Sequence, residues 1–260
     1  MFKGQTYTGS SFFELMSTEA PDALPDFGGM DWTSVELPHG TTILSMLYAD
    51  GTLMAGDRLA TAGHQVATRD IEKVFRIDDT CLMAIAGAAG PAVEMVRMFQ
   101  LELEHFEKLE GQEITFEGKA NRLSFLLRQN LPAAMSGMVV MPLFCGFDHD
   151  KGRGRIYKFD ITGGRYREHD YYSDGSGGKD ARNSLKKSYR HGMSRDEAIY
   201  AAVEALSDAA DEDRATGGVD LLRGIYPIIK IATSSGIEDV SEDEIKRLNE
   251  LVLAEKKGHL

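Results

Sequence analysis

Short runs of apolar and β-branched residues predict β-strands at several places after residue 40. Residues 41–48 and 52–57 are two such runs, and the turn pair Asp50-Gly51 separates them. This arrangement predicts a β-hairpin. The same signals predict six further strands, at residues 71–77, 81–86, 137–147, 154–160, 166–172 and 225–232.

Apolar residues spaced three or four positions apart predict helices between and after these strands. Ala92, Met95, Phe99 and Leu103 follow this spacing behind Pro91, a residue that a first helical turn accepts. Two later helices begin at capping boxes of the form Ser-x-x-Glu. The predicted helices are residues 91–109, 118–135, 179–190, 195–211 after the box at Ser194, and a last helix after the box at Ser241.

The order of these elements predicts the fold class. Strands follow strands and helices follow helices, which disfavours a parallel sheet built from alternating strands and helices. Two antiparallel sheets need cover, and pairs of helices can supply it on the two outer faces. We therefore expect an α+β fold, a four-layer α-β-β-α sandwich formed by residues 41–260.

The first 40 residues differ from the rest of the chain. They hold three of the seven prolines, the only tryptophan (Trp32), and six acidic residues against the single base Lys3. They therefore carry −5 of the formal net charge of −12, which leaves −7 on residues 41–260. Neither the two-residue alternation typical of a strand nor the three-to-four-residue spacing typical of a helix continues for long in these residues. Residues 1–40 are predicted to be an extended or poorly ordered tail.

Composition and charge narrow the classes of function. A chain with 42% hydrophobic and 27% charged residues is typical of a soluble globular protein. Its acidity argues against nucleic-acid and anionic-membrane partners, and no apolar run reaches the roughly 20 residues that span a bilayer. We expect no signal peptide and no cofactor or metal. Cys81 and Cys145 lie in apolar runs, which predicts buried thiols in a cytoplasmic protein.

The junction Gly40-Thr41-Thr42 is the strongest candidate for chemistry. The sequence contains no GxSxG elbow, no HExxH motif and no phosphate loop of the Walker type. A cut between Gly40 and Thr41 would leave Thr41 with both a hydroxyl and a free α-amine. An α-amine has a pKa of about 8, so part of it is neutral at physiological pH. The neutral amine can accept the hydroxyl proton and replace the histidine of a serine hydrolase. Residues 1–40 would then keep the nucleophile inactive until they are removed.

Asp57 and Lys73 are candidates for an ion pair beside this threonine. Lys73 lies on the same face of its predicted strand as Ile71 and Phe75, where a charged side chain needs a partner. Its ammonium would favour the neutral form of the α-amine, and Asp57 would keep the lysine charged. Gly87, where a strand gives way to a helix, could offer a backbone N–H to an oxyanion.

Six segments, taken in order, resemble the β-subunits of the proteasome. They are GTTIL, MAGDRLAT, RDIEKVF, AIAGAAG, DGSGG and DEDRATGGVD, and the resemblance covers about residues 41–235. It is closest to the bacterial, actinobacterial type. These subunits are N-terminal nucleophile hydrolases with an α-β-β-α fold, consistent with the layers predicted above. The resemblance implies a threonine-type endopeptidase.

The resemblance also implies roles for individual residues. Thr41 matches the catalytic threonine, freed by cleavage after Gly40, and Asp57 and Lys73 match its acid and its lysine. The other matched positions are Ser176, Asp213, the oxyanion glycine Gly87, and Thr216, which stands where many members of the family have serine.

Substrate-binding positions follow from the same matching. The backbones of Thr61 and Ala89 match positions that hold the substrate as an added strand. The first specificity pocket should be lined by apolar residues, which predicts cleavage after hydrophobic or aromatic residues. These pocket positions are Ala60, Ile71, Phe75, Ile85 and Ala89.

Beyond the site, the resemblance implies assembly. Similar β-subunits form seven-membered rings inside a twenty-eight-subunit barrel whose outer rings are proteasome α-subunits. A ring ATPase acts through the α ring and unfolds the polypeptides that are degraded in the chamber. Assembly is coupled to removal of the propeptide, here residues 1–40, by attack of Thr41 on the Gly40 carbonyl.

Two alternatives stay open at this point. N-terminal nucleophile acylases and amidases share the fold and the self-cleavage, although the combination of Asp57, Lys73, Ser176 and Asp213 fits the proteasomal branch better. The other alternative is a non-catalytic structural ring subunit. Such subunits replace the threonine junction with an N-terminal helix, whereas this sequence retains Thr41.

Overall fold

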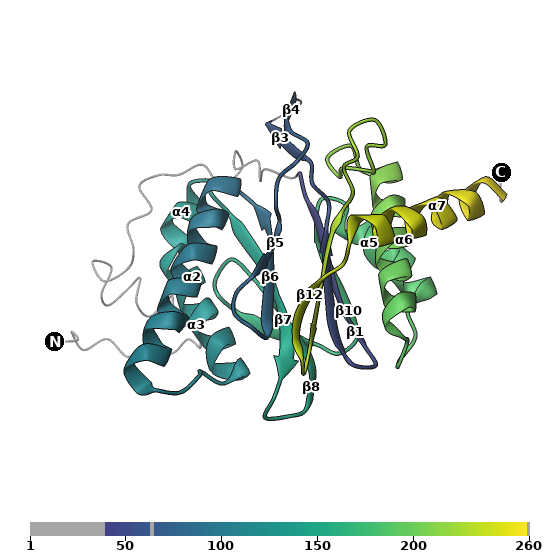
Figure 1. Cartoon of the computed structure of the whole chain (residues 1–260). Coiled ribbons are helices and arrows are strands. Elements are labelled where there is room, and N and C mark those ends of the chain that lie inside the picture. Colours follow the sequence, from purple (N-terminus) through teal and green to yellow (C-terminus); the bar gives the residue numbers. More distant parts are fainter. Residues whose placement is uncertain (1–39, 63–64, 259–260) are drawn as a thin grey trace, which may run out of the picture. The chain divides into compact units, whose positions relative to one another are not determined.

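The computed structural model describes residues 40–62 and 65–258 (Figure 1). The predicted tail therefore lies outside the described residues, except for Gly40, and its role as a removable propeptide stays a prediction.

One five-stranded sheet contains the predicted N-terminal hairpin. Its strands are β1 (Thr42–Tyr48), β2 (Gly51–Gly56), β10 (Tyr171–Gly175), β11 (Ile228–Thr233) and β12 (Gly236–Asp239). They lie in the order β10-β1-β2-β11-β12, and every neighbouring pair is antiparallel. The hairpin of β1 and β2 is confirmed.

The second five-stranded sheet is also antiparallel throughout. It runs in the order β5-β6-β7-β8-β9. Its strands are β5 (Val74–Arg76), β6 (Cys81–Gly87), β7 (Val140–Asp148), β8 (Arg153–Phe159) and β9 (Arg165–Glu168). A separate ribbon of β3 (Ala60–Ala62) and β4 (Gln65–Thr68), which the sequence did not predict, extends beyond the sheets (Figure 1).

Helices cover the outer face of each sheet, as Figure 1 shows. Those on the sheet of β5–β9 are α2 (Ala89–Glu110), α3 (Phe116–Gln129) and the short α4 (Leu131–Met135). Those on the other sheet are α5 (Gly178–Ser188), α6 (Arg195–Glu212) and α7 (Glu242–Gly258). The predicted four-layer α-β-β-α sandwich is confirmed.

Central strands are buried on both faces, which explains why they are mainly apolar. In β1, Ile43 packs between the sheets while Leu44 faces α5, α6 and α7. In β6, Leu82 packs between the sheets while Met83 faces α2 and α3. Side chains alternate between the faces of a strand, so a strand between two layers is apolar at most positions on both faces.

Three predicted elements differ from the structure. The helix predicted at 118–135 breaks after Gln129, because Pro132 has no N–H for a continuous ladder and instead lies in the first turn of α4. The strand predicted at 166–172 is two strands, β9 and β10, which belong to different sheets. The strand predicted at 71–77 is reduced to Val74–Arg76, so Lys73 precedes it.

The two cysteines are free and buried, as predicted. Burial raises the pKa of the Cys145 thiol to about 11 and raises that of Cys81 as well. Within residues 40–62 and 65–258, no helix combines the length and the apolar character needed to cross a membrane.

Candidate active site

Thr41 immediately precedes β1 and is only 6% exposed. Its Oγ1 donates a hydrogen bond to the carbonyl oxygen of Gly40, 2.7 Å away. The Thr41 carbonyl in turn accepts from the backbone N–H of Ser176 at 2.9 Å. Gly175 leaves room for that contact, since it has a φ of +92° and a Cβ there would overlap the Thr41 carbonyl oxygen. The threonine is therefore held between its own strand and the end of β10.

Asp57, at the end of β2, is fully enclosed and accepts hydrogen bonds at both carboxylate oxygens. Oδ1 accepts from the backbone N–H of Thr42 at 2.8 Å and from Lys73 Nζ at 2.7 Å. Oδ2 accepts from the N–H groups of Leu59 at 2.9 Å and Gly217 at 2.8 Å. A carboxylate has about four sites for donors, and all are used here. The side chain is consequently fixed in one orientation.

Lys73 connects this carboxylate to the residue before the threonine. Its Nζ donates to Asp57 Oδ1, to the Leu59 carbonyl at 2.6 Å and to the Gly40 carbonyl at 3.0 Å. Three acceptors match the three hydrogens of an ammonium group. Burial lowers the pKa of Lys73 below its ordinary value of 10.5, and the charge of Asp57 opposes that effect. The sequence-based expectation of an Asp57–Lys73 pair agrees with this geometry.

A second carboxylate, that of Asp213, is connected to Thr41 through Ser176. Asp213 follows the last residue of α6, and its Oδ2 accepts from the hydroxyl of Ser176 and, at 2.6 Å, from the hydroxyl of Thr216. The Ser176 hydroxyl is also 3.4 Å from the Thr41 carbonyl oxygen. Asp213, Ser176 and Thr216 thus form one hydrogen-bonded group beside the start of β1.

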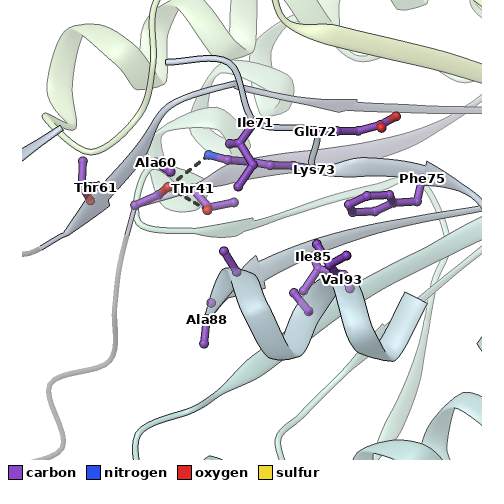
Figure 2. A pocket seen from close by; sticks show the side chains of 14 residues that line it. Thr41, Ala60, Thr61, Ile71, Glu72, Lys73, Phe75, Ile85, Ala88 and Val93 are labelled. Atoms are coloured by element: carbon purple, nitrogen blue, oxygen red, sulfur yellow. Dashed lines mark hydrogen bonds between the residues drawn. The ribbon is translucent and has the colours of Figure 1, made fainter. Parts of the chain in front are cut away.

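A pocket of about 110 Å³ opens next to Thr41 (Figure 2). In Figure 2, Phe75, Ile85 and Val93 point into it, whereas Glu72 extends away from Thr41. All six predicted substrate-binding residues line this pocket, together with residues that the sequence did not assign. The predicted set is Ala60, Thr61, Ile71, Phe75, Ile85 and Ala89, and the additional set is Glu72, Ala88, Ala92 and Val93.

Helical spacing could have identified some of the pocket-lining residues that the sequence did not assign. Val93 lies four residues after Ala89, so both occupy the same face of the first turns of α2. No such spacing pointed to Glu72 and Ala88. Each is only the sequence neighbour of a predicted residue, and adjacency alone does not show that a residue lines a pocket.

A second pocket, of about 230 Å³, lies against Thr41 and is lined mainly by apolar side chains. Gly40, Thr41 and Gly87 line both pockets. The other residues of the second pocket are Ala86, Val139, Met141, Ile161, Asp174, Gly175 and Ser176. The Gly40–Thr41 bond therefore has space on two sides.

Gly87 ends β6 in a conformation that other residues rarely adopt, with φ of +116°. A Cβ at this position would overlap the carbonyl oxygen of Val139. Glycine is thus required for β6 to turn into α2 while remaining against β7. This turn sets the backbone of Gly87 at the border of the two pockets.

No group of three or more His, Cys, Asp or Glu side chains in the described part of the chain is arranged to hold a metal ion. The polar groups around Thr41 bond to one another and to the backbone.

Comparison with known proteins gives one consistent result. The profile of the family described as Proteasome subunit matches residues 37–221, more than half of the chain. A protein of Acidimicrobium ferrooxidans named Proteasome subunit beta is 49% identical over 240 residues, which cover 92% of this chain and 88% of the relative.

Two further relatives carry the same name. That of Streptomyces griseus is 47% identical over 246 residues, or 94% of this chain and 88% of the relative. That of Acidothermus cellulolyticus is 47% identical over 259 residues, or 96% of this chain and 88% of the relative. The similarity therefore extends over nearly the whole length of both partners in each comparison.

Proposed function

Because the chain belongs to the proteasome β-subunit family, we propose that it is a threonine endopeptidase whose nucleophile is Thr41. The observation that carries this proposal is the Gly40–Thr41 junction. The Thr41 hydroxyl and the Lys73 ammonium both donate to the carbonyl oxygen of the bond to be cleaved, at 2.7 and 3.0 Å.

Cleavage of this bond by the chain itself is the first proposed step. Thr41 Oγ attacks the Gly40 carbonyl carbon, the Gly40–Thr41 C–N bond breaks, and the hydroxyl proton passes to the departing nitrogen. The product is an ester between Gly40 and Thr41 Oγ. Water then hydrolyses this ester, which leaves a Gly40 carboxylate, a free Thr41 hydroxyl and a free α-amine. Donation from Lys73 supports the step, since it polarises the carbonyl that is attacked.

The same atoms would then act on peptide substrates. The neutral α-amine accepts the hydroxyl proton as Thr41 Oγ attacks the substrate carbonyl, and it returns the proton to the leaving amine as the peptide C–N bond breaks. Water then hydrolyses the ester left on Thr41 Oγ, which releases the substrate carboxylate and restores the threonine hydroxyl. Lys73 holds positive charge beside the nucleophile. The Ser176, Asp213 and Thr216 group orients the amine, and the backbone N–H of Gly87 stabilises the oxyanion.

The pocket beside Thr41 supports a preference for hydrophobic or aromatic residues before the cleaved bond. Its lining includes the apolar side chains of Phe75, Ile85 and Val93, whereas the lining residue Glu72 extends away from Thr41 and Lys73 is bonded to Asp57. The backbones of Thr61 and Ala89 would hold the substrate as an added strand. The second pocket would receive the residues after the cleaved bond.

Assembly is part of the proposal. We expect seven-membered β rings between rings of proteasome α-subunits, with a ring ATPase that delivers unfolded polypeptides, in the cytoplasm. Enclosure in a chamber would supply the selectivity that an apolar pocket lacks.

The test is self-processing in a purified system. Wild-type chain and Thr41→Ala are each mixed with the α-subunit, and intact mass and N-terminal sequence are followed. We expect the wild type to become a 220-residue product that begins at Thr41 and hydrolyses a fluorogenic hydrophobic peptide, whereas Thr41→Ala stays at 260 residues. Thr41→Ser, which keeps a hydroxyl, serves as the control and should still be processed.

Three results would overturn the proposal. Loss of residues 1–40 from Thr41→Ala would show that another protease makes the cut. A wild-type chain that stays whole in assembled rings would leave Thr41 without an amine, which is the behaviour of a structural subunit. Processed rings that hydrolyse small amides but no peptide would indicate an acylase.

A further inference from the structure

Thr42, the residue after the proposed nucleophile, contacts one carboxylate of the candidate active site, Asp57, and is connected to the other, Asp213, through Thr216. It is 0% exposed. Its backbone N–H donates to Asp57 Oδ1 at 2.8 Å, and its hydroxyl oxygen lies 2.6 Å from that of Thr216. Thr216 is bonded to Asp213. One residue of β1 therefore joins the group of Asp57 and Lys73 to the group of Asp213, Ser176 and Thr216.

The direction of the hydrogen bonds between Thr42, Thr216 and Asp213 follows from their chemistry. An ionised carboxylate only accepts, so the single hydroxyl hydrogen of Thr216 is directed to Asp213 Oδ2. The short contact between the two threonine hydroxyls then requires Thr42 to be the donor. The order is Thr42 to Thr216 to Asp213. Thr42 thus holds the Thr216 hydroxyl in the orientation in which it donates to the carboxylate.

The backbone around this pair is shaped to accommodate it. Gly177 has an ordinary φ of −83°, so its conformation does not require glycine. A Cβ on Gly177 would nevertheless overlap the hydroxyl oxygens of both Thr42 and Thr216. The absence of a side chain at this position leaves the space that the two hydroxyls occupy.

We propose that Thr42 is a positioning residue of the peptidase reaction, acting through its hydroxyl on Thr216 and Asp213. This inference rests on the proposed function. Thr42 does not touch the substrate carbonyl. It sets the group that would surround the α-amine of Thr41, so its loss should slow the chemical step more than it weakens substrate binding.

The test uses processed, assembled rings carrying Thr42→Val, which is close in shape to threonine but lacks the hydroxyl, and Thr42→Ser, which keeps the hydroxyl. Thr42→Val should lower kcat about tenfold, as expected for loss of one buried hydrogen bond, with KM changed less than about twofold. Thr42→Ser should restore most of kcat. Thr52→Val is the matched control, because Thr52 is equally buried on β2 and, in the described part of the chain, has no hydrogen bond to the site.

A double variant distinguishes loss of the hydrogen-bonded network from general destabilisation of the protein. Thr216→Val and Thr42→Val remove two members of the same chain of hydrogen bonds. The double variant should therefore lose about as much kcat as the more damaging single variant rather than the product of the two losses. Gly177→Ala, which crowds the same hydroxyls, should lower kcat in a chain that has both threonines, and it provides the test if Thr42→Val fails to assemble.

Several results would overturn the inference. They are wild-type kcat in Thr42→Val or in Gly177→Ala, a Thr42→Ser variant as slow as Thr42→Val, or losses that multiply in the double variant. Failure of the proposed function is recognised separately, since wild-type rings would then be processed without hydrolysing the peptide or would not be processed at all.

Discussion

At the scale of single residues, the contacts of Lys73 distinguish two roles for this side chain. A lysine that served as a general base before processing would need a free electron pair directed to the Thr41 hydroxyl. The observed Nζ instead has three acceptors, the Gly40 and Leu59 carbonyls and Asp57. This geometry is that of an ammonium group, which favours polarisation of the Gly40 carbonyl over proton abstraction.

The lowered pKa of Lys73 makes this role testable by pH. Free lysine keeps its proton up to about pH 10.5, whereas burial makes Lys73 lose its proton at a lower pH. The charged fraction therefore falls as pH rises, and the rate of self-processing should fall with it, beginning below pH 10.5. The measurement is the rate of conversion from 260 to 220 residues by intact mass across alkaline pH.

Circular dichroism at each pH provides the control that the chain remains folded. The uncleaved chain has no α-amine at Thr41, so that group adds nothing to the profile. A processing rate that continues to rise through pH 10.5 would argue that the neutral amine of Lys73 acts as a base instead.

Residue chemistry alone pointed to Thr41, Asp57 and Lys73, whereas Ser176, Asp213, Thr216 and the pocket residues followed only from the family resemblance. A charged lysine in an apolar run needs a partner, and Asp57 is that partner at 2.7 Å. The contact of Thr42 with Thr216 was beyond prediction. These residues are 174 positions apart, and no local pattern says that the end of α6 returns to the start of β1.

At the scale of elements, the junction between β6 and α2 brings Gly87 to the two pockets. Both a positive φ and the close approach of the Val139 carbonyl require glycine there. Gly90, three residues later in α2, has neither constraint, since a Cβ at that position would meet nothing within 4 Å. The two glycines form a matched pair for substitution.

Gly87→Ala should lower the free energy of unfolding by more than about 1 kcal/mol, because alanine is strained at this φ and overlaps a carbonyl oxygen. It should also reduce kcat/KM, since the strain is relieved only by moving a wall of both pockets. Gly90→Ala should leave activity unchanged and stability equal or up to about 1 kcal/mol higher. Denaturant unfolding and peptide hydrolysis measure both effects.

Equal stability and activity in the two variants would contradict the requirement for glycine at position 87. A loss of activity in Gly90→Ala as large as in Gly87→Ala would show instead that the N-terminal turn of α2 tolerates no added methyl group.

Element boundaries were predicted where local signals mark them. The capping box at Ser194 is complete, with the Ser194 N–H bonded to Glu197 at 2.7 Å, and α6 begins there. The box at Ser241 is formed only in part. The Ser241 hydroxyl accepts from the Glu244 N–H, but the Glu244 carboxylate pairs with Arg195 at 2.6 Å. A tertiary contact thus competes with a local motif.

At the scale of the whole molecule, the first 40 residues differ in charge from the body that they precede. They carry −5 of the net charge of −12 and the only tryptophan. Processing should therefore yield a subunit with a formal charge of −7 that lacks tryptophan fluorescence. Denaturing isoelectric focusing, read by tryptophan fluorescence and by total protein stain, checks both properties together.

The expected result is a less acidic band that stains for protein and shows no tryptophan fluorescence. The Thr41→Ala chain is the control and should keep one fluorescent, more acidic band. A processed band that retains tryptophan fluorescence would mean that the cut lies before Trp32 and not at Gly40–Thr41.

The sequence by itself determined the layers and the hairpin at the start of residues 41–260, because periodicity and turn pairs are local properties. The Gly40–Thr41 junction stays a prediction, which residue chemistry and the family resemblance support together. Only the tertiary structure decided that residues 166–172 divide between two sheets, that a second pocket adjoins Thr41, and that Thr42 joins two carboxylates. These features depend on how the two sheets pack together, and packing is set by contacts between residues distant in the chain, which no local period encodes.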